Sequence, residues 1–229
     1  MKKKSNLSSD DWEEFYKNEN PWGFDGIRKD LIRIKIINDC FKEKSFKNGI
    51  DIACGEGFLL NKLNFIRSKI GVDISRTAIR RAKSNYPKIK FYDGNPFLEF
   101  KIKKKFEFIS CFEALYYPSS LEARKKAMKN LLQYGTKNSI YALSVVTIGK
   151  NNHRNYFTRD SFLKLISENF KTLKIIPISA NYNLPIVQKI FIELLFIFRR
   201  KYAINLSAKF VINAKKEDIY QELFICKKI

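Results

Sequence analysis

From residue 49 onward, short apolar runs alternate with segments of helical periodicity. Seven such runs are present, at residues 50–53, 69–73, 89–92, 106–111, 139–146, 172–179 and 220–227. Two parallel strands need a crossover connection, which is usually a helix. Runs that are almost continuously apolar indicate strands covered on both faces. The pattern therefore predicts an α/β fold with a mostly parallel, seven-stranded sheet and helices on both of its faces.

The helices expected between these strands lie at residues 58–65, 76–85, 121–134 and 159–169, the last with Thr158 as its N-cap. Two further helices, at residues 9–18 and 26–41, precede the first strand. A length of 229 residues fits one domain. We therefore expect an N-terminal helical cap at residues 1–48 and one main domain at residues 49–229.

An insertion of unusual composition separates the sixth and seventh strands, at residues 180–218. It holds an apolar helix at 184–200 and a second apolar piece at 206–212. Lys189, Glu193 and Arg200 fall on one narrow stripe of the apolar helix by helical spacing. The rest of that helix predicts burial against the sheet, burial against a partner subunit in a homodimer, or peripheral contact with a membrane. The segment is shorter than the roughly 17 to 25 residues that span a bilayer.

The chain is strongly basic, with 44 Lys and Arg against 23 Asp and Glu and a net charge of +21. Two interpretations stay open. The charge could attract polyanions such as nucleic acids. Alternatively, because 33 of the 44 basic residues are Lys, and Arg is the usual choice for bidentate phosphate recognition, the charge is background from an AT-rich genome.

The four cysteines predict neither a disulfide framework nor a metal site, because they form no C-x-x-C pair and two of them lie in apolar runs. The basic residues 1–5 are followed by acidic residues and not by an apolar stretch, so they do not form a secretory signal. We therefore expect a cytoplasmic protein.

The segment of residues 50–59 passes from a strand through a turn of small residues into a helix. Small side chains at Ala53, Gly55 and Gly57 allow a sharp turn and close approach of a ligand to the backbone. Leu60 stands where a dinucleotide motif would have its third glycine, and no Gly-Lys-Ser/Thr follows, which excludes a P-loop. Asp73, 18 residues after Gly55, ends the second strand where a carboxylate can accept both hydroxyls of a ribose.

With these motifs the sequence resembles the class I (Rossmann-like) S-adenosylmethionine-dependent methyltransferases, over about residues 49–226. The resemblance implies a seven-stranded sheet with an antiparallel last strand, and S-adenosylmethionine as the cofactor. It implies that Asp51, Ala53, Gly55 and Gly57 hold the methionine part, with Ala53 in place of the usual first glycine. It also implies that Asp73 binds the ribose and that Asn95, or its rival Asp93, accepts from the adenine amino group.

Within that superfamily, residues 20–23 (Asn-Pro-Trp-Gly) and 113–117 (Glu-Ala-Leu-Tyr-Tyr) are most similar to the nodulation-protein-S group. Members of that group methylate an amino sugar nitrogen on a saccharide-lipid acceptor. The resemblance implies methyl transfer to a nitrogen or oxygen of a small molecule, such as a saccharide or amino sugar intermediate. Trp22 is expected to close over the cofactor as part of the cap.

Two side chains are candidates for acid and base chemistry on the acceptor: Glu113, after the fourth strand, and His153, the only histidine. Glu113 could instead cap a helix or orient the cofactor turn, and His153 could be a surface residue. Tyr116, Tyr117 and Tyr156 are expected to line the acceptor pocket. Two other functions compete: an RNA or DNA methyltransferase that uses the basic surface, and a non-catalytic, membrane-associated protein with a degenerate cofactor fold.

Overall fold

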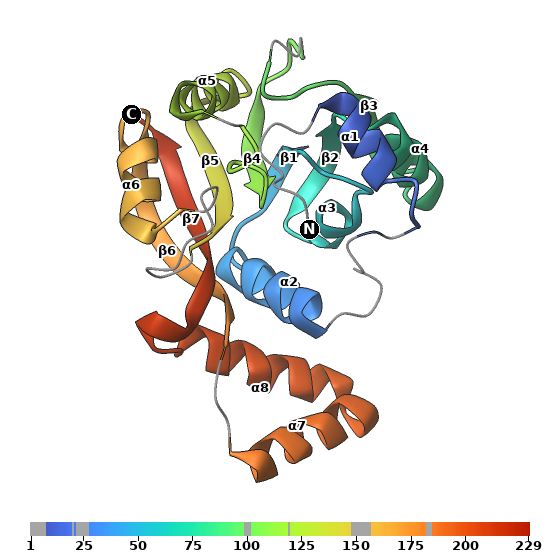
Figure 1. The fold of residues 1–229 in the computed structure, drawn as a ribbon, viewed down its shortest axis with the longest axis vertical. Helices are drawn as coiled ribbons and strands as arrows, with labels where there is room; N and C mark the ends of the chain where they lie inside the picture. Colours follow the sequence, from blue (N-terminus) through green and yellow to red (C-terminus); the bar gives the residue numbers. More distant parts are fainter. Residues whose placement is uncertain are drawn as a thin grey trace.

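The computed structural model describes residues 8–19, 21, 28–98, 102–118, 120–147, 157–181 and 185–229. Its centre is a twisted sheet of seven strands in the order β3-β2-β1-β4-β5-β7-β6 (Figure 1). The strands are β1 (Phe46–Ile52), β2 (Ile66–Asp73), β3 (Lys90–Asp93), β4 (Phe106–Phe112), β5 (Gly135–Val146), β6 (Phe170–Ala180) and β7 (Ile219–Lys228). Each of the seven predicted strands is present.

The direction of the strands also agrees with the prediction. Strands β1 to β5 pair in parallel, and β7 lies antiparallel between β5 and β6. The strand order reverses between β1 and β4, because β1 connects onward to β2 on one side and β4 to β5 on the other. In sheets of this kind the carboxyl ends of the strands at the reversal border a crevice where ligands bind.

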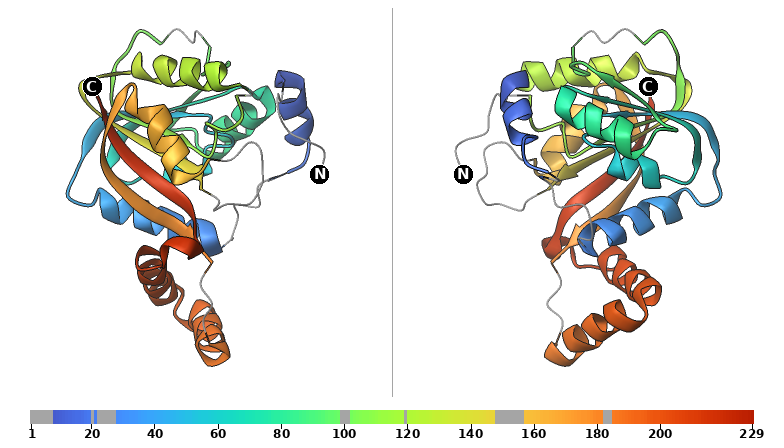
Figure 2. Two further views of the ribbon diagram at one scale, coloured as in Figure 1. Left: turned by 60° about the vertical axis from the view of Figure 1, so that its left-hand side comes forward. Right: turned by 90° about the vertical axis from the view of Figure 1, so that its right-hand side faces the viewer.

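Side chains of each central strand alternate between two apolar clusters, one on each face of the sheet. In β7, Leu223 and Ile225 belong to the first cluster, and Phe224 and Cys226 belong to the second. The first cluster is covered by α2 (Arg28–Cys40), α3 (Phe58–Lys62), α4 (Arg76–Asn85) and α8 (Arg200–Ile212), and the second by α5 (Leu121–Leu132) and α6 (Arg159–Ser167). The predicted helices on both faces are therefore confirmed (Figure 2).

Hydroxyl side chains define where three of these helices begin. Ser75, Ser120 and Thr158 are the N-caps of α4, α5 and α6, and each accepts a hydrogen bond from a backbone N–H three residues later. Such caps satisfy amide groups that have no partner within the helix. The predicted cap at Thr158 is confirmed.

The two N-terminal helices have different environments. Helix α2 buries Ile32, Ile34, Ile36 and Ile37 in the first apolar cluster, so it is part of the main core. Helix α1 (Ser9–Phe15) buries none of its own residues and lies at the edge of the molecule near α4 (Figure 1). The expected border at residue 48 falls inside β1, which begins at Phe46.

The insertion between β6 and β7 differs from the prediction. It forms two helices of similar length, α7 (Ile186–Phe198) and α8, separated at Arg199, followed by a short 3₁₀ helix at Lys216–Asp218. The prediction that the apolar helix is buried against the sheet is wrong. Ile192 is the one buried residue of α7, and the other side chains of this helix are exposed or half-buried. Arg200 begins α8 and so does not extend the polar stripe of α7. Within the described residues no helix is long and apolar enough to cross a membrane.

Candidate functional site

A cavity of about 600 Å³ opens at the carboxyl edge of the sheet where the strand order reverses. Its walls come from the ends of β1, β2 and β4, from the segments after β3 and β4, and from helices α1 and α2. This volume lies within the range of ordinary small-molecule and cofactor sites. Eight of the predicted site residues line it: Asp51, Ala53, Gly55, Asp73, Asn95, Glu113, Tyr116 and Tyr117.

The turn after β1 has a backbone shape that favours small residues. Ala53, Gly55 and Gly57 have φ values of 61°, 53° and 78°, all in the left-handed region. This conformation carries little penalty for glycine, whereas it costs alanine about 1 to 2 kcal/mol. A Cβ at Gly55 would also lie 2.7 Å from the Tyr16 hydroxyl oxygen. Gly57 is the N-cap of α3 and packs beside Phe91 outside the cavity wall.

Asp73 joins this turn to the end of β2. Its carboxylate oxygens accept hydrogen bonds from the backbone N–H of Gly55 at 2.8 Å and of Ser75 at 3.0 Å. The side chain is buried, and burial raises its pKa to about 6 although those two bonds act in the opposite direction. A carboxylate held in this way keeps lone pairs that can accept from a ligand in the cavity.

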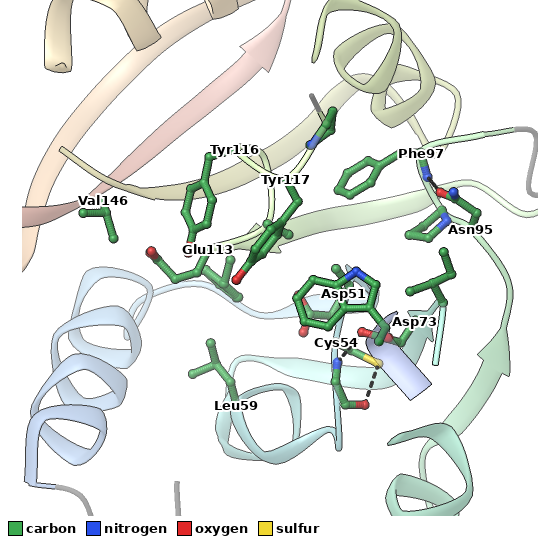
Figure 3. A pocket seen from close by; sticks show the side chains of 18 of the residues that line it. Asp51, Cys54, Leu59, Asp73, Asn95, Phe97, Glu113, Tyr116, Tyr117 and Val146 are labelled. Carbon is green, nitrogen blue, oxygen red and sulfur yellow. Dashed lines mark hydrogen bonds between the residues drawn. The ribbon is translucent and has the colours of Figure 1, made fainter. Parts of the chain in front are cut away.

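Asp51 lies at the floor of the cavity beneath the turn (Figure 3). The hydroxyl of Ser110 donates to its Oδ1 atom at 2.7 Å. Burial raises the pKa of Asp51 to about 7; the nearby Asp73 adds to the increase, while the Ser110 bond and the Arg33 charge oppose it. Two buried carboxyls with raised pKa values in one cavity are typical of a functional site.

The two candidates for the adenine contact have different positions. Asn95 is on the cavity wall, where its Oδ1 atom accepts from the backbone N–H of Phe97 at 3.0 Å. Asp93 is exposed outside the cavity wall and lies 3.7 Å from the Arg76 guanidinium. This placement favours Asn95.

Glu113 has an unusual combination of properties. Its φ of 56° places a long side chain in the left-handed region, a conformation that persists only where the surrounding structure enforces it. The Ser144 hydroxyl donates to Oε1 at 2.7 Å, whereas the buried Oε2 atom has no hydrogen-bond partner within the described chain. Burial raises the pKa of Glu113, and the Arg33 charge and the bond from Ser144 oppose this increase.

The residues of the cavity wall that were not predicted include Trp12, Tyr16, Asp30 and Arg33. Trp12 of α1 contacts the Tyr117 ring edge-on at a centroid distance of 4.8 Å. Arg33 and Asp30 form a buried ion pair at 2.7 Å on α2. Their i,i+3 spacing, among the four isoleucines of the helix, is the one sequence signal that could have indicated them.

Three predicted residues, Trp22, His153 and Tyr156, lie outside the described part of the chain, so their roles stay predictions. Among the described residues, Trp12 takes the position over the cavity that was expected for Trp22.

Fold and cavity together define an α/β protein with a cofactor-sized site at the topological switch point of its sheet. The methyltransferase domain family matches residues 43–221. The chain therefore belongs to this family.

Solved structures with the same fold agree with this assignment. N-methyltransferase NodS from Bradyrhizobium japonicum WM9, in complex with S-adenosyl-L-homocysteine, has a TM-score of 0.66 and 13% identity, over 96% of this chain and 97% of that chain. The complex between the Haloferax volcanii Trm112 methyltransferase activator and the putative methyltransferase has a TM-score of 0.67 and 11% identity, over 94% of this chain and 96% of that chain. An S-adenosylmethionine-dependent methyltransferase from Clostridium acetobutylicum ATCC 824 has a TM-score of 0.59 and 13% identity, over 95% of this chain and 98% of that chain. No curated protein matches the chain in sequence.

These findings confirm the predicted class: the chain is an enzyme of the S-adenosylmethionine-dependent methyltransferase type with a Rossmann-like sheet. They also confirm the predicted likeness to the nodulation-protein-S group as a likeness of fold. The acceptor and the role of each cavity residue stay predictions.

Proposed function

We propose that this chain transfers the methyl group of S-adenosylmethionine to a nitrogen or oxygen of a small molecule, with a saccharide or amino sugar as the favoured acceptor. The observation that carries the proposal is the placement of Asp73 and Glu113 in one cavity, with Asp51 and Tyr117 between them (Figure 3). One end of the cavity thus offers groups for a nucleoside, and the other offers a buried carboxyl for the acceptor.

The nucleoside end fits the cofactor in two respects. Asp73 can accept from the two ribose hydroxyls, and the Asn95 amide oxygen can accept from the adenine amino group. Phe97 beside Asn95 on the cavity wall adds an apolar surface for the adenine ring. Because Ala53 and Gly55 are small, the turn that they form leaves space for a ligand between Asp73 and the floor of the cavity at Asp51.

The floor fits the amino-acid part of the cofactor, which carries one positive and one negative group. The Arg33 guanidinium is buried and lines the cavity, so it can pair with a carboxylate. Asp51, on the floor, can accept from an ammonium group. Because Asp51 has a pKa of about 7, an ammonium partner would favour its ionised form.

The acceptor end has the groups that methyl transfer needs. S-adenosylmethionine supplies an electrophilic methyl group, so the protein has to align the acceptor and keep water out. An amine acceptor must be unprotonated and a hydroxyl must release its proton, and Glu113 with a raised pKa can take that proton. Tyr116 and Tyr117, whose ring centroids are 4.7 Å apart, offer flat apolar surface and hydroxyl groups suited to a sugar ring.

The charges around the cavity favour a neutral or cationic acceptor over a polyanion. The wall contains four acidic side chains, Asp30, Asp51, Asp73 and Glu113, against three basic ones, Lys29, Arg33 and Lys126. The chain as a whole has 44 basic residues against 23 acidic ones, but among the described residues only three of the basic side chains line the cavity. A site for RNA or DNA would be expected to concentrate that charge at its mouth.

Calorimetric titration with S-adenosyl-L-homocysteine tests the cofactor half of this proposal. We expect Asp73→Ala to weaken binding by about ten- to a hundredfold, because hydrogen bonds to a charged group are worth roughly 1.5 to 3 kcal/mol. Asp93→Ala is the matched control: it removes the same charge from the neighbouring strand end outside the cavity wall. Equal affinities of the two variants, or no binding to the wild type, would contradict the proposal.

Transfer of a labelled methyl group to a panel of amino sugars, neutral saccharides and RNA tests the acceptor half. We expect an amino sugar or saccharide to be labelled, and Glu113→Gln to lower kcat by about a hundredfold or more while cofactor affinity is retained. Labelling of RNA alone would favour the nucleic-acid alternative. Absence of transfer to the panel and to a cell extract would favour a non-catalytic protein.

A further inference from the structure

Helix α7 exposes a continuous apolar face. Its seven exposed apolar side chains are between 48% and 76% accessible: Ile186, Val187, Ile190, Phe191, Leu194, Ile197 and Phe198. Because successive residues of a helix are about 100° apart, these seven fall within an arc of about 140°. Contiguous exposed apolar surface of this kind marks an interaction site in a folded protein.

The exposed face is not the one that attaches α7 to the protein. Ile192 is buried and Leu195 and Phe196 are half-buried on the opposite side, and the Arg28 guanidinium lies 4.5 Å from the centre of the Phe196 ring. Helix α8 in turn buries Ala208 and Val211 in the first apolar cluster. The two helices form a hairpin that projects from the molecule at the end opposite α5 (Figures 1 and 2).

Positive charge borders the exposed face. Residues 185–212 contain five basic side chains and a single acidic one, Glu193. Glu193 forms an ion pair with Arg28 of α2, so its negative charge is compensated. Arg199, Arg200 and Lys201 are exposed at the turn of the hairpin, next to Ile197 and Phe198.

We propose that the α7 face binds the surface of a membrane that contains anionic lipids. An amphipathic helix with an apolar arc and basic flanks inserts its apolar side chains at the boundary of headgroups and acyl chains. Each Lys or Arg near an anionic surface adds to the attraction. The 13 residues of α7 rise about 20 Å, too short to cross the bilayer core, so the helix lies in the plane of the membrane.

A second copy of the chain suits this face less well. In a two-fold dimer the same patch meets itself, so each copy would bring its basic Arg199–Lys201 cluster to the contact region with no unpaired acidic side chain in either hairpin to offset it. A lipid surface supplies the opposite charge.

Co-sedimentation of the full chain with vesicles tests the proposal. We expect binding to phosphatidylcholine vesicles that contain phosphatidylglycerol, and binding at least about tenfold weaker to phosphatidylcholine alone. Replacing Ile190, Phe191 and Ile197 by Gln should reduce binding by about tenfold or more. The control replaces three equally exposed apolar residues elsewhere, Leu121, Leu173 and Ile229, by Gln and should leave binding unchanged.

A second pair of variants separates charge from apolar contact. Arg199→Gln, Arg200→Gln and Lys201→Gln together should weaken binding to the anionic vesicles by about tenfold or more, whereas Lys103→Gln, Lys104→Gln and Lys137→Gln, exposed at the opposite end, should not. Circular dichroism confirms that each variant is folded. Failure of the wild type to bind either vesicle would overturn the proposal, as would equal binding by the α7 variant and its control. A dimer in sedimentation velocity that the α7 substitutions dissociate, without vesicle binding, would assign the face to a second copy.

Discussion

At the scale of single residues, Glu113 combines a left-handed backbone with a buried carboxylate oxygen that lacks a hydrogen-bond partner within the described chain. Both features cost stability, the second by roughly 1 to 3 kcal/mol. A residue that costs stability in the folded protein is expected where the site needs it in contact with a ligand. The carboxylate is therefore the first group in the cavity to test.

Replacing Glu113 by Gln should make stability less dependent on pH. Burial raises the pKa of this carboxyl above its ordinary value of 4.5, so the folded state holds the proton to higher pH than the unfolded chain does. Glu113 therefore contributes a loss of stability as pH rises above 4.5, and this contribution is absent from the Gln variant. We expect the stability of the variant relative to the wild type to increase as pH is raised from about 4.5 to 8. Thermal unfolding across this range measures the difference.

Exposed Glu217 provides the control for that experiment, because Glu217→Gln removes the same group from the surface. Its stability curve should run parallel to that of the wild type. A Glu113→Gln curve that also runs parallel would show that the carboxyl titrates as it does in the unfolded chain.

The affinity for S-adenosyl-L-homocysteine should depend on pH through Asp73. Burial raises the pKa of Asp73 to about 6, and only the ionised form accepts from both ribose hydroxyls. Affinity should therefore be full above pH 6 and fall by up to about tenfold per pH unit below it. The Asp73→Asn variant should bind more weakly, and its affinity should not fall further below pH 6. If the affinity of the variant falls below pH 6 as that of the wild type does, the titrating group is another one, such as Asp51.

The sequence identified some cavity residues and not others for a physical reason. Ala53, Gly55 and Asp73 belong to one strand-turn-helix unit and the strand beside it, so their spacing along the chain already implies their proximity. Arg33 and Trp12 reach the cavity only because α2 and α1 pack against the sheet edge. No local pattern encodes such long-range packing.

At the scale of elements, α1 is held over the cavity by polar contacts to α4. The Glu13 carboxylate accepts from the backbone N–H groups of Arg76 and Thr77, the latter at 3.2 Å. Arg81 of α4 donates to the Asn18 carbonyl at 2.8 Å. Because α1 buries none of its own residues, these polar contacts hold it over the cavity together with the Trp12–Tyr117 ring contact.

Glu13→Ala should loosen α1 without unfolding the domain. We expect faster hydrogen exchange of the α1 amides and dissociation of S-adenosyl-L-homocysteine accelerated by roughly tenfold, since the loss of two bonds to a carboxylate costs about 1.5 kcal/mol or more. Glu14→Ala is the control, because Glu14 is exposed on the same helix and pairs with Lys17. Equal dissociation rates in the two variants would mean that Glu13 does not hold the cover.

The two helices of the insertion should differ in their contribution to stability. Val211 of α8 is 3% exposed in the first apolar cluster, whereas Ile197 of α7 is 68% exposed. We expect Val211→Ala to lower the free energy of unfolding by roughly 1 to 2 kcal/mol, and Ile197→Ala to change it by less than about 0.5 kcal/mol. Urea denaturation measures both, and a large effect at Ile197 would contradict the exposure of the α7 face.

The sequence predicted the sheet better than the insertion. Strands of the sheet are marked by apolar runs because both of their faces are buried in any packing of this fold. An apolar helix such as α7 has no such requirement, and its composition is equally compatible with the core, a partner or a lipid surface. Only the three-dimensional arrangement separates these cases.

At the scale of the whole molecule, the net charge is +21. In the part of the chain that the structure describes, this positive charge is not concentrated at the cavity, whose acidic side chains outnumber the basic ones by four to three. Diffuse positive charge attracts polyanions without selecting among them. Any affinity for nucleic acid is therefore expected to come from counterion release alone.

Filter binding with single-stranded RNA tests this expectation. Weak retention at low salt should fall by at least about tenfold on raising salt to the physiological level, because each neutralised phosphate adds to the salt dependence. Saturating S-adenosyl-L-homocysteine should leave the retention unchanged, since the positive charge of the described residues is not concentrated at the cavity. Retention that resists salt, or that depends on the cofactor product, would instead place RNA at the cavity and make it the acceptor.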